Sequence, residues 1–186
     1  MVWNLYLAAV PTVLALVLFR RPARLGVGWW MTFVVWLLFL PNAPYVLTDV
    51  VHMGADLRRA RSDDHIYLVL ATYAVFAAAG LASYVVSMQL FRRFLHRVAP
   101  RRAVAAILVT VHGLCVIAMY LGRVVRLNSW DVLVEPGRVL ESVLRVPRPF
   151  TVVVLAWMFV IVGVSAYAMA TIGDKAISEL RRLKLH

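Results

Sequence analysis

Five long apolar runs divide the chain, and the segments between and after them hold every Asp, Glu, Lys and Arg. A hydrocarbon core about 30 Å thick needs about 20 apolar residues of α-helix, and each run approaches or meets that length. The pattern predicts an all-α integral membrane protein, a five-span transmembrane helix bundle. We expect spans at residues 2–19, 25–40, 66–90, 103–121 and 151–172, followed by a short cytoplasmic tail at 173–186.

The composition excludes a soluble domain. Hydrophobic residues make up 63% and charged residues 16% of the 186 residues, against about 45–50% and about 25% in soluble domains. No repeat and no long linker divides the chain, so residues 1–186 are expected to form one membrane domain. The formal charge of +11 comes from arginine clusters between apolar runs, which is typical of topology signals and lipid headgroup contacts and not of nucleic-acid binding.

The distribution of basic residues predicts the orientation. Segments 20–24, 92–102 and 173–186 hold 12 Lys and Arg, and segments 41–65 and 122–150 hold 8. Short cytoplasmic loops carry the excess of positive charge, so we expect the amino terminus outside and the carboxyl terminus in the cytoplasm. The first run has no basic residue before it, which favours a retained anchor over a signal peptide.

The second span ends in a polar sequence that contains two prolines, Pro41 and Pro44. Proline lacks the backbone donor and restricts the residue before it, so an unbroken α-helix is not expected there. We predict an interruption between Pro41 and Pro44 and a short helix over residues 45–53. Helical spacing would then place five polar side chains on one face: Tyr45, Thr48, Asp49, His52 and Asp56.

This face allows three interpretations. Asp49 could orient His52 as a general base, with both as candidate catalytic residues. Alternatively Asp49, His52 and Asp56 could offer ligands to a divalent metal ion, although no cofactor is predicted outright. In the third interpretation the polar groups are structural, with Asp49 capping a helix and pairing with an arginine.

A second polar stretch follows the fourth span. Arg123 and Arg126 lie one helical turn apart and could bind an anion, because a guanidinium holds phosphate or carboxylate through two hydrogen bonds. With five spans this stretch emerges on the same membrane face as residues 41–65, so Asp131 becomes a third candidate catalytic residue. Further candidate contacts to an anion or substrate are Asn42, Tyr45, Asn128 and Trp130.

Three other features have structural explanations. Residues 136–147 are predicted to form a short amphipathic helix on the membrane surface. The small residues Ala74, Ala78 and Ala82 are expected to let neighbouring helices approach closely. His112 lies in the middle of a span, where it either serves a function or bonds as a neutral side chain to a neighbouring helix.

The two polar motifs, Pro41-Asn42-Ala43-Pro44-Tyr45 with Asp49 and His52, and Gly122-Arg123 continuing to Asp131, resemble the signature of the membrane family known as domain of unknown function 1361. The resemblance extends from the second span to the fifth. It implies a small multi-pass protein of the bacterial cytoplasmic membrane and carries no assigned activity.

Three functions remain open from the sequence. The polar cluster could bind or act on an anionic lipid or envelope substrate at the outer membrane face. The broken second span could instead belong to a small transporter or channel subunit. The chain could also be a scaffold or assembly partner. Expected partners are membrane lipids and, in addition, a second copy or another membrane protein; nucleic acid is not expected.

Overall fold

The computed structural model describes residues 2–20, 25–122, 134–144 and 149–183. These residues are helical almost throughout and contain no strand, so the all-α prediction is confirmed for the described part of the chain. The elements, in order, are α1 (Val2–Phe19), α2 (Val27–Phe39), α3 (Asn42–Tyr45), the 3₁₀ turn η1 (Val46–Asp49), α4 (Val50–Arg59), α5 (Asp63–Val98), α6 (Arg101–Tyr120), α8 (Pro136–Leu144) and α9 (Pro149–Leu183).

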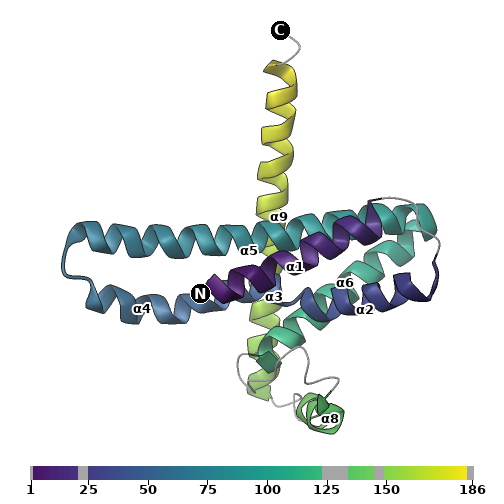
Figure 1. Cartoon of the computed structure of the whole chain (residues 1–186), viewed down its shortest axis with the longest axis horizontal. Coiled ribbons are helices and arrows are strands. Elements are labelled where there is room, and N and C mark those ends of the chain that lie inside the picture. Colours follow the sequence, from purple (N-terminus) through teal and green to yellow (C-terminus); the bar gives the residue numbers. More distant parts are fainter. Residues whose placement is uncertain (1, 21–24, 123–133, 145–148, 184–186) are drawn as a thin grey trace.

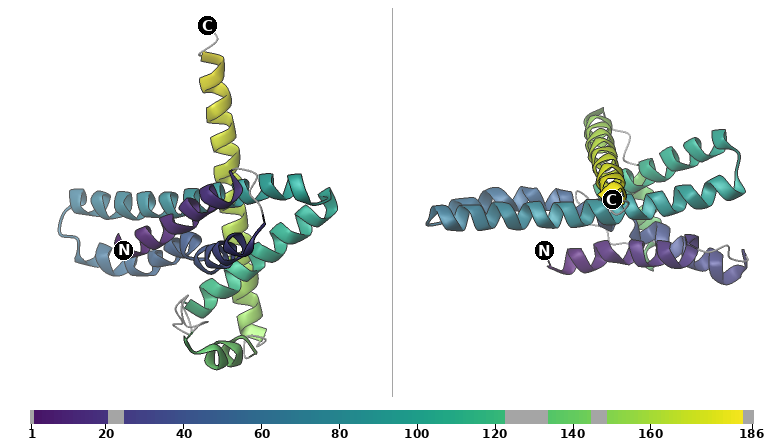
Figure 2. Two further views of the ribbon diagram at one scale, coloured as in Figure 1. Left: turned by 45° about the vertical axis from the view of Figure 1, so that its right-hand side comes forward. Right: turned by 90° about the horizontal axis from the view of Figure 1, so that it is seen from above.

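The long helix α5 organises the molecule (Figure 1). Helix α1 packs along α5 and against α2, while α4 runs back beside the first half of α5 and α6 folds back from its end. Helix α9 contacts α5 and α6 but crosses α5 at a steep angle in every view (Figures 1 and 2). Of the four predicted spans other than α5, those at α1 and α6 pack against α5, the one at α2 packs against α1, and the one at α9 crosses α5.

Three helical runs are long and apolar enough to cross a membrane: Val27–Arg59, Asp63–Val98 and Arg101–Tyr120. Two shorter apolar helices, Trp3–Phe19 and Val152–Ala168, cover the remaining predicted spans. Many large apolar side chains on these helices are exposed, including Val75, Trp157 and Val164. Such exposure is too costly in water and identifies the surface of a membrane protein.

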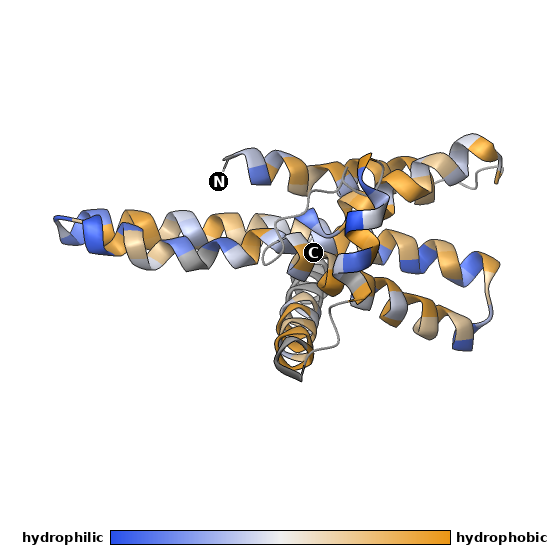
Figure 3. Ribbon diagram, turned by 90° about the horizontal axis from the view of Figure 1, so that it is seen from below, coloured by the Kyte–Doolittle hydropathy of each residue, from blue (hydrophilic) through white to orange (hydrophobic). Residues whose placement is uncertain are grey.

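An aromatic cluster forms much of the core where α1, α2 and α5 meet. Phe19 is 1% exposed and packs edge-on against Trp36, with ring centroids 5.0 Å apart, and against Phe91 at 5.1 Å. Trp29 stacks on Phe33, and its indole nitrogen donates to the carbonyl oxygen of Leu18 at 3.3 Å. The three helices share one core, and hydrophobic residues cover much of the ribbon outside the turns (Figure 3).

The second span is interrupted, as predicted, but at Leu40 and Pro41 and not between Pro41 and Pro44, since residues 42–45 form α3. Helix α2 ends at Phe39, directly before Leu40 and Pro41, because neither Pro41 nor Pro44 can donate a backbone hydrogen bond. The chain continues through α3 and η1 before α4 begins at Val50. Its direction changes between α2 and α4, since the left panel of Figure 2 shows α2 nearly end-on and α4 lengthwise. Residues 45–53 are thus not one short helix, because the 3₁₀ turn occupies residues 46–49.

Another part of the chain closely approaches α5 at a different residue from the predicted alanines. Ala74 and Ala78 are exposed, so they do not pack against another described helix. Instead Gly80 faces the break. A Cβ atom added there would lie 2.6 Å from the carbonyl oxygen of Ala43 and 3.0 Å from Cβ of Val46. The absence of a side chain at Gly80 lets α3 and η1 rest directly on α5.

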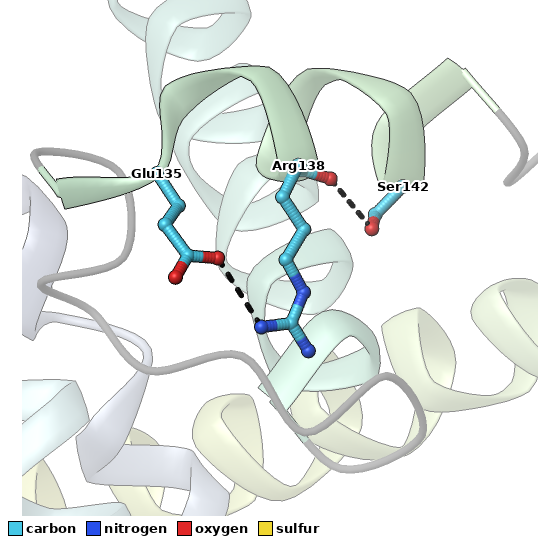
Figure 4. A network of polar contacts seen from close by, with 3 residues as sticks. All are labelled: Glu135, Arg138 and Ser142. Carbon is cyan, nitrogen blue, oxygen red and sulfur yellow. Dashed lines mark hydrogen bonds and ion pairs between the residues drawn. The ribbon is translucent and has the colours of Figure 1, made fainter.

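Helix α8 carries a small polar network (Figure 4). The Arg138 guanidinium donates to the Glu135 carboxylate at 3.3 Å, and the Ser142 hydroxyl donates to the backbone oxygen of Arg138 at 2.8 Å. Leu140 and Leu144 are 60% and 69% exposed. The amphipathic helix predicted for residues 136–147 is present over residues 136–144, and its leucines are left uncovered by the described residues.

Candidate functional site

Asp49 lies at the centre of the break. It ends η1 and is only 3% exposed. Its carboxylate oxygen Oδ2 accepts a hydrogen bond from the side-chain amide of Asn4 in α1, at 3.0 Å. Although Asp49 precedes the first residue of α4, its side chain makes no capping hydrogen bond, so the capping part of the structural interpretation is wrong. The carboxylate is directed toward α1 instead.

Two further side chains satisfy backbone groups at the break. The Asn42 amide donates to the carbonyl oxygen of Phe39 at 3.1 Å, and the Thr48 hydroxyl donates to that of Tyr45 at 2.6 Å. Backbone groups that lose their helical partners need such bonds when they are buried. The polar residues Asn42 and Thr48 thus stabilise an irregular helix.

The remaining predicted members of the helical face, Tyr45, His52 and Asp56, lie in different surroundings. Tyr45 packs against the hydrophobic core. His52 is exposed. Asp56 accepts a hydrogen bond from the Tyr73 hydroxyl of α5 at 2.7 Å, and Arg59 lies 3.9 Å from its other oxygen. Among the described residues no three His, Cys, Asp or Glu side chains are placed to hold a metal ion. Asp49, His52 and Asp56 are accordingly not gathered as a ligand set.

The second half of the predicted site lies outside the described residues. This applies to five of the candidate residues: Arg123, Arg126, Asn128, Trp130 and Asp131. The described part of α6 ends at Tyr120, and Gly122 is the last described residue before this stretch. The meeting of Asp49 and His52 with these residues remains a prediction.

His112 joins three helices. Its Nδ1 atom lies 2.6 Å from the Tyr84 hydroxyl of α5, and its Nε2 atom lies 3.1 Å from the carbonyl oxygen of Phe159 in α9. A carbonyl can only accept, so Nε2 carries the proton, and Nδ1 of a neutral ring then accepts from Tyr84. Gly163 leaves room for this ring, since a Cβ atom there would lie 3.4 Å from Nε2. The bonding fits the neutral, structural interpretation of His112.

The sequence interpretation overlooked several partners. Asn4 was the only amide in the first apolar run, and this isolation was a usable signal for a buried polar contact. Thr12 of α1 lies 2.6 Å from the Ser83 hydroxyl of α5, which donates in turn to the Ala8 carbonyl oxygen. Tyr73 gave no signal, because only the fold shows that it reaches Asp56.

The apolar helices and the polar break together define the class of the protein as an all-helical membrane protein. The family model described as "Protein of unknown function (DUF1361)" matches residues 3–170, and the chain belongs to that family. The resemblance found in the two polar motifs is thereby confirmed. Neither the curated proteins nor the solved structures gave a match.

Proposed function

We propose that this chain is a five-span protein of the bacterial inner membrane that binds an anionic lipid headgroup or envelope substrate at the outer face. The amino terminus would lie outside, and residues 1–186 would form one membrane domain. Support comes from the five apolar runs and from the excess of Lys and Arg in the segments assigned to the cytoplasm.

The observation that carries the proposal is the burial of Asp49. This carboxyl group is 3% exposed at the point where the helix is broken, and it accepts a hydrogen bond from the Asn4 amide; buried carboxylates are characteristic of sites that bind a charged group. Arg123 and Arg126 are two of the eight basic residues that parity of the spans brings to this face, and they follow the fourth span directly. We assign them to the same site as Asp49, where a guanidinium held by the carboxylate would keep donors for an anion.

An arginine suits this task because its five donors form a planar fork. One edge can bond to a carboxylate while the other bonds to a phosphate. Asn128, Trp130 and Tyr45 would line the bound group. His52, which is exposed, would be accessible to it and, with Asp131, would supply acid or base chemistry if the bound group is a substrate.

Helix α8 would lie on the membrane surface beside the site. Leu140 and Leu144 share one side of the helix, since they are four residues apart, and both are exposed. Immersing them in the lipid boundary would remove that apolar area from water, while Arg138 and Glu135 stay hydrated.

The site is tested by replacing Arg123 with lysine, which keeps the charge and removes the fork. We expect Arg123→Lys to weaken binding of phosphatidylglycerol about tenfold and to leave the thermal unfolding temperature in detergent nearly unchanged. Arg138→Lys is the matched control, because Arg138 is half-exposed and pairs with Glu135, and it should alter neither quantity. Unchanged lipid binding with a lowered unfolding temperature would leave a structural bridge, as in a scaffold, and reject the site.

The topology is tested with a reporter fused to the carboxyl terminus. Five spans place the reporter in the cytoplasm. The test is informative because α9 crosses α5 at a steep angle. If there are five spans, α9 must turn to span the membrane beside α5. A reporter active only in the periplasm would instead mean four spans with α9 along the membrane plane.

A further inference from the structure

A pocket of about 330 Å³ lies between α4 and the first turns of α5, away from the break. Its polar side is formed by Asp56, Arg59, His65 and Tyr73, and its apolar side by Leu68 and Val69. The function proposed above uses none of these residues except Asp56, which was considered only as a metal ligand.

The charges in this pocket are arranged to attract an anion. Residues 56–65 contain three aspartates and three arginines, but Asp63 and Asp64 do not line the pocket. The one carboxylate that does, Asp56, is already bonded to the Tyr73 hydroxyl at 2.7 Å. Arg59 is 3.9 Å from Asp56, too far for a hydrogen bond, and its side chain is 80% exposed. The side chain of Arg59 is therefore accessible from outside the pocket that it lines, as is exposed His65.

The pocket also straddles a boundary between polar and apolar sequence. The turn that joins α4 to α5 is the most hydrophilic end of this hairpin (Figure 3), and the apolar run of α5 starts at Ile66. Leu68 is 65% exposed and follows Ile66 along α5. In a membrane protein, this places basic side chains at headgroup depth and aliphatic ones at the start of the acyl chains.

We propose that the pocket binds a phospholipid, with its phosphate at Arg59 and His65 and the upper part of one acyl chain against Leu68 and Val69. The Tyr73–Asp56 hydrogen bond would hold α4 against α5 and so keep Arg59 beside the pocket. This site is separate from the one at Asp49 and Arg123 and does not depend on it.

The test is calorimetric titration of the full-length protein in a non-ionic detergent with short-chain phosphatidylglycerol and, separately, with inorganic phosphate. Both titrations are made in the Arg123→Lys background, so that the other proposed site contributes little. We expect Arg59→Gln to weaken lipid binding about tenfold, as loss of a charge-assisted contact does. Arg58→Gln is the matched control, since Arg58 is the adjacent exposed arginine and does not line the pocket.

Arg58→Gln should change the affinity by less than about twofold, as expected of an exposed charge. Inorganic phosphate should bind at least about tenfold more weakly than the lipid, because it lacks the apolar contact. Equal losses in the two arginine variants would show general surface attraction and overturn the site. Equal affinities for phosphate and lipid would overturn the acyl-chain contact, and an unaffected Arg59→Gln would overturn the whole proposal.

Discussion

His112 and Asp49 are both buried titratable residues among apolar helices, and they are held in opposite ways. His112 has a partner on each ring nitrogen, from α5 and from α9, and a neutral ring with the proton on Nε2 satisfies both. Asp49 accepts from the neutral amide of Asn4 and sits where the helix is broken. A neutral group that bonds on both sides joins helices, whereas a buried carboxylate beside irregular backbone suits a binding site.

The largest expected effect concerns the contact that supports the break. In Gly80→Ala the new Cβ would meet the Ala43 carbonyl oxygen at 2.6 Å, so α3 and η1 must move away from α5. We expect the free energy of unfolding to fall by about 2–3 kcal/mol. Anionic lipid binding should fall with it, because Asp49 moves with η1. Thermal unfolding and lipid titration check this result.

Gly113→Ala is the control for that substitution. Nothing lies within 4 Å of the corresponding Cβ in α6, so alanine should be neutral or raise the free energy of unfolding by about 0.5–1 kcal/mol through its helix propensity. Equal behaviour of the two variants would mean that α5 does not rest on the break.

The second prediction compares a variant that should lose stability, His112→Leu, with one that should lose lipid binding, Asp49→Asn. His112→Leu leaves the Tyr84 hydroxyl and the Phe159 carbonyl without their partner, so the free energy of unfolding should fall by about 2 kcal/mol. Lipid binding should be retained. Asp49→Asn keeps the shape and an acceptor for Asn4 but removes the charge, so it should weaken lipid binding with little loss of stability.

Stability and binding are measured on both variants in the same detergent. If His112→Leu abolished binding at a temperature where the protein is still folded, His112 would belong to the functional site and not to the helix packing.

The smallest effect is expected from Tyr84→Phe. This change removes one hydrogen bond to His112 and leaves its bond to Phe159 in place. Polar contacts within membrane helices contribute about 0.6 kcal/mol on average, so the unfolding temperature should fall slightly and less than in His112→Leu. A loss as large as that of His112→Leu would mean that the Phe159 contact contributes nothing.

The positions of the helices and the positions of their ends differ in how far the sequence could predict them. The first helix and the proline interruption follow from local chemistry; the helix was predicted at the observed residues, and the interruption was predicted at Pro41 to Pro44 but begins at Leu40. The predicted spans 66–90 and 151–172 are shorter than the observed helices α5 and α9. A count of apolar residues stops at charged residues, whereas helical hydrogen bonding continues through them. Local pattern thus predicts where helices occur better than where they end.

Contacts between helices were the least predictable part. Spacing placed Ala74 and Ala78 on one face of a helix but could not tell whether that face meets another helix, and the close approach occurs at Gly80. Likewise, Asp49 was selected as a site residue, but its bond to Asn4 joins residues 45 positions apart. Such a bond depends on how α1 and the break are placed in three dimensions.

The central claim is that Asp49 and Arg123 act as one unit in binding an anion. A double-mutant cycle with Asp49→Asn and Arg123→Gln tests it most directly, with phosphatidylglycerol affinity as the measured quantity. If Asp49 acts by holding Arg123, the double variant should bind about as weakly as the weaker single variant, because either change removes the same interaction. Losses that add in full, as for independent sites, would contradict the account.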